Sequence, residues 1–343
     1  MRVIRVLVVD DSAFVRKVMR QMLSRSPFIE VVGTARDGAE ALTLVEQLKP
    51  DVVTLDLNMP GADGVTFLKA QMARQPLPVI VVTMAAKDGL QVVEALEAGA
   101  IDVIQKPTAL ATDKIVEISE ELIAKVKAAS ATSLRPVSPV LASCAASLPA
   151  RPPAKTDMVV IAVSTGGPQA LKFLIPRLPG EFPVPIAIVL HMPVGYTALY
   201  AKSLNEASAL DVVEASQGDE LRPGRVLLAP AGHHLTFAKG QDGCAFAQLS
   251  LSPFDTPHRP SADVLFKSAA DLFGERTLGI VLTGMGSDGT QGASWIKAKG
   301  GRILVEAEES CVVYGMPRSV VEAGLYDTCL PLGKMANALL ESL

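Results

Sequence analysis

The chain has 343 residues, of which 49% are hydrophobic, and its formal net charge at pH 7 is −4. This length allows two domains, and the mild charge argues against the basic surface of a nucleic-acid-binding protein. The four cysteines are widely spaced without a CxxC pair, so we expect thiols in a reducing compartment rather than disulfides or a zinc site. No apolar run reaches the roughly 18 residues of a membrane span, and we expect a cytoplasmic protein with no direct membrane insertion.

Strand and helix patterns alternate between residues 4 and 107. The strand patterns are apolar runs at residues 4–10, 30–36, 51–57, 77–84 and 101–107. The first run is interrupted by Arg5 and leads into acidic residues, which favours a strand over a signal peptide. Five such βα units predict an α/β fold with a five-stranded, parallel, doubly wound sheet of the flavodoxin-like type. In such a sheet, ligands bind at the carboxyl ends of the strands.

Polar side chains fall at these predicted strand ends. Asp10 and Asp11 follow the first strand, and Asp56 lies on the third. Thr83 and Lys106 lie late on the fourth and fifth strands. Carboxylates gathered at one point repel each other unless a cation neutralises them, and hard oxygen ligands suit Mg²⁺. Each residue alone could be a solvated strand end, but five at one sheet edge favour a Mg²⁺-dependent phosphoryl site.

This half of the chain resembles a response-regulator receiver domain. The resemblance is carried by VLVVDDS at residues 6–12, TLDLNMPGADG at residues 54–64, Thr83 and the Lys106–Pro107 pair. It implies that the aspartate of the second motif, Asp56, accepts a phosphoryl group from a histidine kinase of the CheA type.

The resemblance also implies a metal site and a switch. Mg²⁺ would be held by Asp10, Asp11 and Asp56 with the backbone of Asn58, and Thr83 and Lys106 would be the switch residues. Val103 stands where the family usually has an aromatic residue, which puts an aromatic rotamer switch in doubt but not phosphorylation. The Lys106–Pro107 peptide is cis in the family, but most X–Pro bonds are trans, and the sequence leaves both isomers open.

The composition changes after a predicted helix at residues 110–128. Alanine, serine and proline dominate residues 129–155, which predicts a linker. We favour a disordered tether over a segment that docks on another surface. The predicted domains are therefore a receiver at residues 1–128, the linker at 129–155 and a second domain at 156–343.

Buried-strand patterns resume in the second domain. They occupy residues 157–163, 185–191, 276–285 and 302–308, and each is followed by a turn and a helix pattern. This order predicts a second doubly wound, mostly parallel sheet. Residues 225–252 alternate in polarity around a turn at Gly240–Gly243, which predicts an inserted antiparallel hairpin.

Ser164 ends the first of these strand patterns. Thr165, Gly166 and Gly167 turn the chain, and Pro168 suits the first turn of a helix. A serine at the carboxyl end of a strand is how an open α/β sheet presents a nucleophile. A phosphate-binding loop or a plain tight turn would use the same residues.

Four histidines limit the search for a base. His191 ends the strand pattern nearest in sequence to the serine turn, so both could lie at one sheet edge. His233 and His234 lie in the predicted hairpin, where we expect one to pack and one to be exposed. An adjacent pair of histidines could bind a metal ion, but no third ligand lies nearby at the spacing of a zinc site. His258 lies in a proline-rich loop before Ser261, a predicted helix cap.

A third strand end carries TGMGSDG, residues 283–289. Asp288 could orient His191, which would take the Ser164 proton, or it could only cap the next helix. Backbone amides such as that of Met285 could form an oxyanion hole. The order Ser, His, Asp matches neither the α/β-hydrolases nor the two protease orders, and no GxSxG elbow occurs, so this would be a convergent site.

The second half resembles the catalytic domain of the CheB family, the chemotaxis protein-glutamate methylesterases and glutamine deamidases. The matching motifs are STGGP at 164–168, HMP at 191–193, LAPAGHHL at 228–235, RPSADVLF at 259–266, LTGMGSDG at 282–289 and YGMPR at 314–318. With the receiver in front, the resemblance covers nearly the whole chain outside the linker. The chain has HMPVGY where the family commonly has HMPPGF, which could tune the cleft but leaves the triad positions intact.

The resemblance implies a Ser164–His191–Asp288 triad, with the Met285 amide and Thr165 serving the oxyanion. The implied reactions are hydrolysis of glutamate γ-methyl esters, with release of methanol, and deamidation of glutamines. The substrates would be methyl-accepting chemoreceptors in chemotaxis-type adaptation, and no metal would be needed for the esterase step.

The domain order predicts regulation by occlusion. We expect the unphosphorylated receiver to cover the strand ends that bear Ser164, and phosphorylation of Asp56 to weaken or reorient that interface. Deleting residues 1 to about 150 should then raise basal activity. Unchanged or lower activity of a well-folded fragment would contradict simple occlusion.

Two other classes of protein use similar parts. The glycine-rich turns could be phosphate cradles of a nucleotide-binding module. GMGSDG at residues 284–289 fits GxGxxG, but GxxxxGK[ST] does not occur and neither loop carries a phosphate-binding lysine. Receivers also drive DNA-binding outputs, which predicts a small, basic, helical second half rather than a long strand-rich one. Saturable nucleotide binding or salt-sensitive duplex binding would revive these alternatives.

Overall fold

The computed structural model describes residues 2–60, 63–83, 89–106, 112–131, 156–241 and 243–343. The described residues form two compact units, one on either side of position 134. Pro107 and most of the predicted linker lie outside the described residues. The isomer of the Lys106–Pro107 bond and the predicted domain limits therefore stay predictions.

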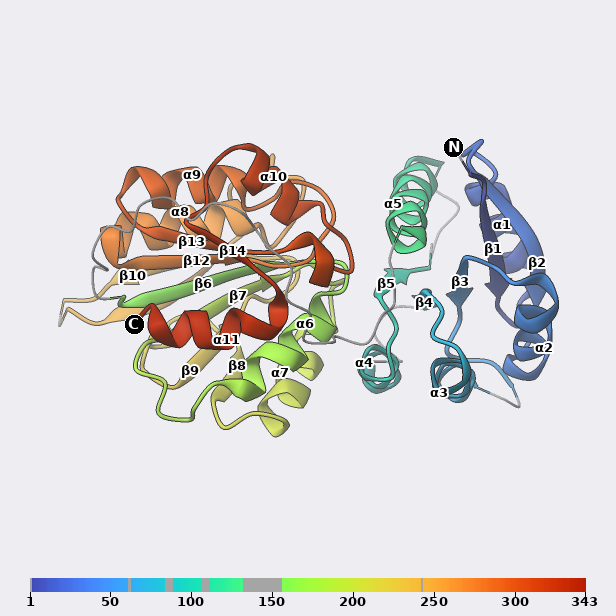
Figure 1. Ribbon diagram of the computed structural model, residues 1–343, viewed down its shortest axis with the longest axis horizontal. Coiled ribbons are helices and arrows are strands. Elements are labelled where there is room, and N and C mark those ends of the chain that lie inside the picture. The colour runs from blue at the N-terminus through green and yellow to red at the C-terminus, as the bar shows by residue number, and fades with distance from the viewer. Residues whose placement is uncertain (1, 61–62, 84–88, 107–111, 132–155, 242) are drawn as a thin grey trace. The chain divides into compact units, whose positions relative to one another are not determined.

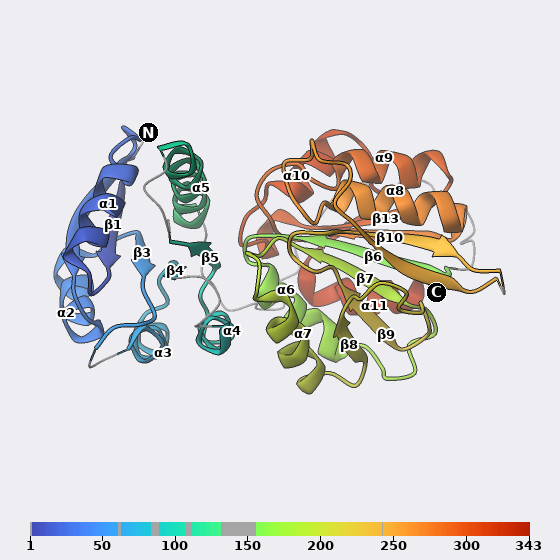
Figure 2. The ribbon, with the colours of Figure 1, turned by 180° about the vertical axis from the view of Figure 1, so that it is seen from behind.

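The first unit alternates strands and helices, as its sequence pattern predicts. Its elements are β1 (Ile4–Val9), α1 (Ala13–Leu23), β2 (Ile29–Ala35), α2 (Gly38–Leu48), β3 (Val52–Leu55), α3 (Gly64–Arg74), β4 (Val79–Thr83), α4 (Gly89–Glu97), β5 (Asp102–Gln105) and α5 (Thr112–Ser130). The strands form one parallel sheet in the order β2-β1-β3-β4-β5. Helices α1 and α5 cover one face and α2, α3 and α4 the other (Figures 1 and 2). This is the predicted five-stranded, doubly wound sheet.

Local signals in the sequence explain where these helices begin. The Ser12, Asp37 and Asp63 side chains each accept a hydrogen bond from a backbone N–H in the first turn of the next helix. Each of these N–H groups lacks a partner inside its own helix, so a side-chain acceptor stabilises the helix end. Every residue of β3 and β4 is buried, because helices cover both faces of the sheet.

The second unit is larger and repeats the same architecture. Its strands are β6 (Met158–Val163), β7 (Ile186–Leu190), β8 (Asp211–Glu214), β9 (Arg225–Leu228), β10 (His234–Lys239), β11 (Ala245–Ser250), β12 (Thr277–Val281), β13 (Arg302–Glu306) and β14 (Thr328–Leu330). Its α-helices are α6 (Gly167–Leu174), α7 (Thr197–Glu206), α8 (Ala262–Phe273), α9 (Thr290–Ala298), α10 (Met316–Glu322) and α11 (Leu332–Glu341). Short 3₁₀ helices occupy Ile175–Arg177, Gly274–Arg276 and Glu308–Ser310.

Seven of these strands form one parallel sheet in the order β14-β13-β12-β6-β7-β9-β8. Helices α8, α9 and α10 cover one face, and α6, α7 and α11 cover the other (Figures 1 and 2). Strands β10 and β11 form a separate antiparallel pair. A mostly parallel α/β sheet with an inserted hairpin was predicted, and the structure confirms it.

The hairpin is shorter than the sequence pattern suggested. Residues 225–228, predicted as part of it, form β9 of the main sheet instead, and the hairpin proper begins at His234. The reason is visible in the sequence of β9: Val226, Leu227 and Leu228 are consecutive apolar residues and all are buried. Such a run fits a strand covered on both faces, whereas a hairpin with one solvated face alternates.

Three central strands of the second sheet, β6, β7 and β12, determine where the candidate site lies. Every residue of β6, β7 and β12 is buried, and β6 lies between the other two in the sheet. Parallel strands end at the same edge of a sheet, so the polar residues that follow these three strands gather at one place.

None of the helices in the described part of the chain combines the length and the apolar composition that a membrane crossing needs.

Candidate functional site

An acidic cluster lies at the carboxyl edge of the first sheet. Asp10 and Asp56 are buried and Asp11 is exposed, and one carboxylate oxygen from each lies within 4.8 Å of the others. The Lys106 Nζ lies 2.7 Å from Asp10 Oδ2 and 2.8 Å from Asp56 Oδ2. Thr83 is fully buried at the end of the neighbouring strand β4. All five residues predicted from strand ends are therefore in the expected strand-end positions.

The electrostatics of this cluster favour additional positive charge. Burial raises the pKa of Asp56; the hydrogen bond and charge of Lys106 lower it, and the Asp10 charge raises it again. A backbone hydrogen bond from Asn58 also lowers it without reversing the shift. Burial alone would lower the pKa of Lys106, but its bonds to the two carboxylates raise it. Three carboxylates with hard oxygen atoms are the donor set that suits Mg²⁺, so the cluster is consistent with a Mg²⁺ site.

Ser164 and His191 follow neighbouring strands of the second sheet. The last paired residues of β6 and β7 are Val163 and Leu190. Ser164 directly follows β6, and His191 directly follows β7. The His191 N–H donates to the Val163 carbonyl at 3.2 Å. The register therefore places the two predicted side chains at adjacent strand ends, as expected, although no hydrogen bond between them occurs.

His191 is bonded to Asp288. Its Nε2 lies 2.8 Å from Asp288 Oδ2, and both side chains are largely buried. An ionised carboxylate can only accept, so Nε2 carries the proton and Nδ1 presents a lone pair. This Nδ1 is buried and has no hydrogen-bond partner among the described residues. The imidazole therefore holds an unused acceptor at the edge of the sheet where Ser164 lies.

Asp288 is also the cap of helix α8. Its carboxylate accepts from the backbone N–H groups of Ala262 and Asp263 at 2.7 and 3.0 Å and from the Ser261 hydroxyl at 2.9 Å. Burial would raise the pKa of Asp288, but the hydrogen bond from His191 and those from the two amides outweigh it and hold the pKa well below its usual value. Asp288 is therefore an anion at neutral pH.

The capping is reciprocal between two helices. Asp288 precedes α9 but caps α8, while Asp263 in the first turn of α8 accepts from Gly289 and Gly292 at the start of α9, at 2.9 and 2.6 Å. Burial and the Asp288 charge raise the pKa of Asp263 to about 6, against the opposing effect of these amides. Ser261 stands at the N-cap position of α8, as predicted, but its hydroxyl donates to Asp288 instead of capping the helix.

Two other histidines support this arrangement. The ring of His258 stacks on that of His191, with centroids 4.3 Å apart and an angle of 25° between the planes. His234 is fully buried, and its Nδ1 accepts from the Ser261 N–H at 3.2 Å, while its Nε2 lies 3.1 Å from the Pro253 carbonyl. Burial lowers the pKa of His234, so it stays neutral.

His233 is exposed, which confirms the expectation of one packed and one exposed histidine. Sequence reasoning assigned no role to His258. His258 directly precedes the RPSADVLF motif at residues 259–266, and this was the only available signal.

The predicted oxyanion loop approaches the serine turn closely. A Cβ on Gly284 would lie 2.8 Å from Ser164 Cβ and 2.5 Å from Met316 Sδ, so only glycine fits there. The next residue, Met285, is half-buried. The Thr283 hydroxyl donates to the carbonyl of Thr165 at 3.0 Å, which ties the loop to the serine turn.

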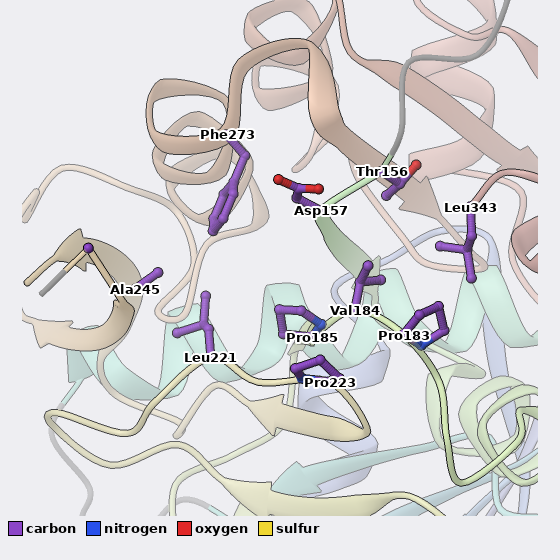
Figure 3. A pocket seen from close by; sticks show the side chains of 11 residues that line it. Thr156, Asp157, Pro183, Val184, Pro185, Leu221, Pro223, Ala245, Phe273 and Leu343 are labelled. Carbon is purple, nitrogen blue, oxygen red and sulfur yellow. The ribbon is translucent and has the colours of Figure 1, made fainter.

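A pocket of the second unit lies away from these residues. Figure 3 shows Phe273, Leu221 and Pro185 around a hollow of about 380 Å³. Its lining residues include Asp157, directly before β6, and Pro185, directly before β7, so it opens at the amino ends of the strands. None of the predicted site residues lines it.

Comparison with known proteins covers both units. A model of the CheB methylesterase family matches residues 159–339, and a model of the response regulator receiver domain matches residues 6–118. Protein-glutamate methylesterase/protein-glutamine glutaminase 5 of Myxococcus xanthus is 51% identical over 338 residues, which cover 98% of this chain and 97% of that protein. A Thermotoga maritima protein with this activity in its name is 41% identical over 343 residues, covering 99% of this chain and 98% of that one.

A solved structure is similar to the second unit. The crystal structure of the Thermotoga maritima CheB methylesterase catalytic domain is 43% identical and covers 55% of this chain and 100% of that one, with a TM-score of 0.53. A receiver sheet with an acidic cluster, joined to an α/β unit with a serine and a His–Asp pair at its strand ends, defines a response regulator with an enzymatic output. The chain belongs to the CheB family. It is a protein-glutamate methylesterase/protein-glutamine glutaminase, regulated by its receiver domain and acting in chemotaxis adaptation.

Proposed function

We propose that Ser164 is the nucleophile of this activity, His191 its base and Asp288 the acid that orients His191. The observation that carries the proposal is the state of the imidazole: Nε2 is bonded to Asp288, and the buried Nδ1 is without a partner among the described residues. In a triad the second nitrogen must hold a lone pair directed at the nucleophile. Rotation of the Ser164 side chain supplies that contact when substrate binds, since apo sites often lack it.

The reaction follows as acyl transfer. Ser164 Oγ attacks the ester carbonyl as His191 Nδ1 takes its proton, and collapse of the tetrahedral intermediate breaks the C–O bond to the methoxy group. That group leaves as methanol with the proton from His191. Water then attacks the acyl-enzyme, gives its proton to His191, and releases glutamate as Ser164 regains a proton. A glutamine follows the same route and releases ammonia.

We propose the Met285 N–H and Thr165 as the groups that stabilise the oxyanion. The support is the close approach of Gly284 to Ser164, because Met285 directly follows Gly284 and Thr165 directly follows Ser164. Preorganised donors at this position typically contribute a few kcal/mol to the stabilisation of such an intermediate.

In the receiver, we propose that Asp56 accepts a phosphoryl group from a histidine kinase of the CheA type. Asp10, Asp11 and Asp56, with the Asn58 backbone, would hold Mg²⁺, which neutralises phosphoryl oxygens when bound. Lys106 lies within hydrogen-bond distance of both buried carboxylates. Its ammonium group could therefore pair with the phosphoryl group on Asp56. Thr83 would complete the switch.

The proposed substrates are methyl-accepting chemoreceptors. We propose that the chain acts in the cytoplasm.

Replacing Asp56 with asparagine is expected to abolish stimulation of the esterase by a small phosphodonor with Mg²⁺, because a carboxamide cannot accept the phosphoryl group. The measurement is methanol release from methyl-labelled receptor membranes, with and without donor. Glu30→Gln removes the same charge from an exposed position on β2 and should keep the stimulation. Stimulation that persists in Asp56→Asn would reject Asp56 as the phosphoacceptor.

A further inference from the structure

A buried carboxylate behind the serine turn has no place in the chemistry described above. Glu306 ends strand β13 and is completely inaccessible to solvent. Its Oε2 accepts from the Thr283 N–H at 2.8 Å, and its Oε1 accepts from the Ser310 hydroxyl at 2.9 Å. No cationic side chain of the described residues pairs with it. Because an unpaired buried charge is costly, its retention calls for a specific use.

Thr283, whose N–H donates to Glu306, connects several backbone segments of the candidate site. The Thr283 carbonyl accepts from the Ser164 N–H at 3.0 Å, and the Thr283 hydroxyl donates to the Thr165 carbonyl at 3.0 Å. The same hydroxyl accepts from the Val313 N–H at 2.9 Å. Thr283 thus fixes the backbone of the serine turn and begins the loop that carries Met285.

The amide of Thr283 depends on a side chain for its partner. The ladder between β12 and β13 runs only to Val281 and Val305, so the N–H of Thr283 lies beyond the last paired residues. A buried N–H without an acceptor destabilises its conformation. The Glu306 carboxylate therefore replaces the missing carbonyl at the point where the sheet ends and the site begins.

We propose that Glu306 is a positioning residue of the esterase site, which acts by holding Thr283 and, through it, the backbone of Ser164 and Thr165. This inference rests on the proposed role of Ser164. A small displacement of a nucleophile can cost on the order of a hundredfold in rate, so loss of this support should lower turnover more than substrate binding.

The ionisation of Glu306 agrees with this geometry. Burial raises its pKa to about 7, and the bonds from Thr283, Ser310 and Cys311 lower it only in part. The hydrogen bond to Thr283 needs an acceptor oxygen at full glutamate length rather than a charge. Glutamine has that oxygen and reach, whereas aspartate has the charge but is one methylene shorter.

The test compares Glu306→Gln, Glu306→Asp and Glu306→Ala in the full chain, with Glu309→Ala as the matched control because Glu309 is an exposed carboxylate of the next turn. Methanol release from methyl-labelled receptor membranes gives kcat and KM, and circular dichroism gives the thermal midpoint. We expect Glu306→Gln and Glu309→Ala to stay within about threefold of the parent, and Glu306→Asp and Glu306→Ala to lose about tenfold or more in kcat with little change in KM.

The ordering of the variants decides the outcome even where Glu306→Ala does not fold. Glu306→Asp as active as Glu306→Gln, or more active, would overturn the proposal, as would a folded Glu306→Ala with the parent's kcat. A Ser164→Ala variant in the same assay separates the two claims. If Ser164→Ala keeps its activity, the proposed nucleophile is wrong, whereas a normal Glu306→Ala beside an inactive Ser164→Ala refutes only the role of Glu306.

Discussion

Replacing Ser164 with alanine is expected to reduce methanol release by on the order of 10⁵-fold or more, to the background without acyl-enzyme formation. The loss is this large because the variant removes the only atom that attacks the ester in the proposed mechanism. His191 and Asp288 cannot substitute for it, since their hydrogen bond only prepares the imidazole to accept a proton.

The fold should survive this change. The contacts that hold the serine turn are made by the backbone: the Ser164 N–H donates to the Thr283 carbonyl at 3.0 Å, and the Ser164 carbonyl accepts from Gly167 at 2.7 Å. Alanine keeps both. The thermal midpoint of Ser164→Ala should therefore lie close to that of the parent, which distinguishes loss of chemistry from loss of structure.

Two measurements check this expectation. The first is methanol release from methyl-labelled receptor membranes, with Ser294→Ala as the control because the Ser294 hydroxyl donates to a carbonyl of its own helix, that of Gln291. The second is labelling by a fluorophosphonate, in which the serine oxygen bonds to phosphorus and fluoride leaves; it needs no receptor. Methanol release that survives in Ser164→Ala would exclude Ser164 as the nucleophile.

Much of the fold and of the site could be predicted because strand ends obey a simple geometric rule. The apolar runs before Ser164 and His191 marked buried parallel strands, and parallel strands end at one edge. The same rule located Asp10, Asp56 and Lys106 in the receiver. The sequence therefore indicated which side chains gather, although their distances came only from the structure.

The rest depended on contacts between segments that no local pattern connects. The stacking of His258 on His191 and the bond from Thr283 to Glu306 each join residues that are far apart in the sequence. Strand β14 has only three residues, too few for a periodic signal. Asp288 was predicted either to orient His191 or only to cap a helix. It bonds His191, as the first alternative predicts, and it also caps α8, because α8 and α9 begin side by side.

Replacing Asp288 with asparagine is expected to lower kcat by about 10⁴-fold, through the tautomer of His191. Both carboxylate oxygens accept: Oδ2 from His191 and Ala262, and Oδ1 from Ser261 and Asp263. An asparagine has one acceptor oxygen, and if that oxygen takes the place of Oδ1, its amide donates to Nε2. The proton of His191 then lies on Nδ1, where it cannot accept from Ser164.

In either orientation the amide faces a backbone N–H of the first turn of α8, that of Ala262 at the Oδ2 position or that of Asp263 at the Oδ1 position. The helix therefore loses a cap at a cost of about 1 kcal/mol. The variant should therefore also be less stable, and its stability should respond differently to acid. The folded-state pKa of Asp288 lies below its unfolded value, so the carboxylate stabilises the parent above the unfolded pKa, and this contribution is lost as pH falls toward the folded one. Asparagine has no such ionisation.

Thermal midpoints between pH 3 and 7 test the second effect, and methanol release at pH 7 to 8 tests the first. Ser261→Ala is the matched control, because it removes one donor to Asp288 Oδ1 and leaves the bond between His191 and Oδ2 in place. It should retain most of the turnover. A folded Asp288→Asn with the parent's kcat would mean that Asp288 serves only as the cap of α8 and that His191 acts without an orienting acid.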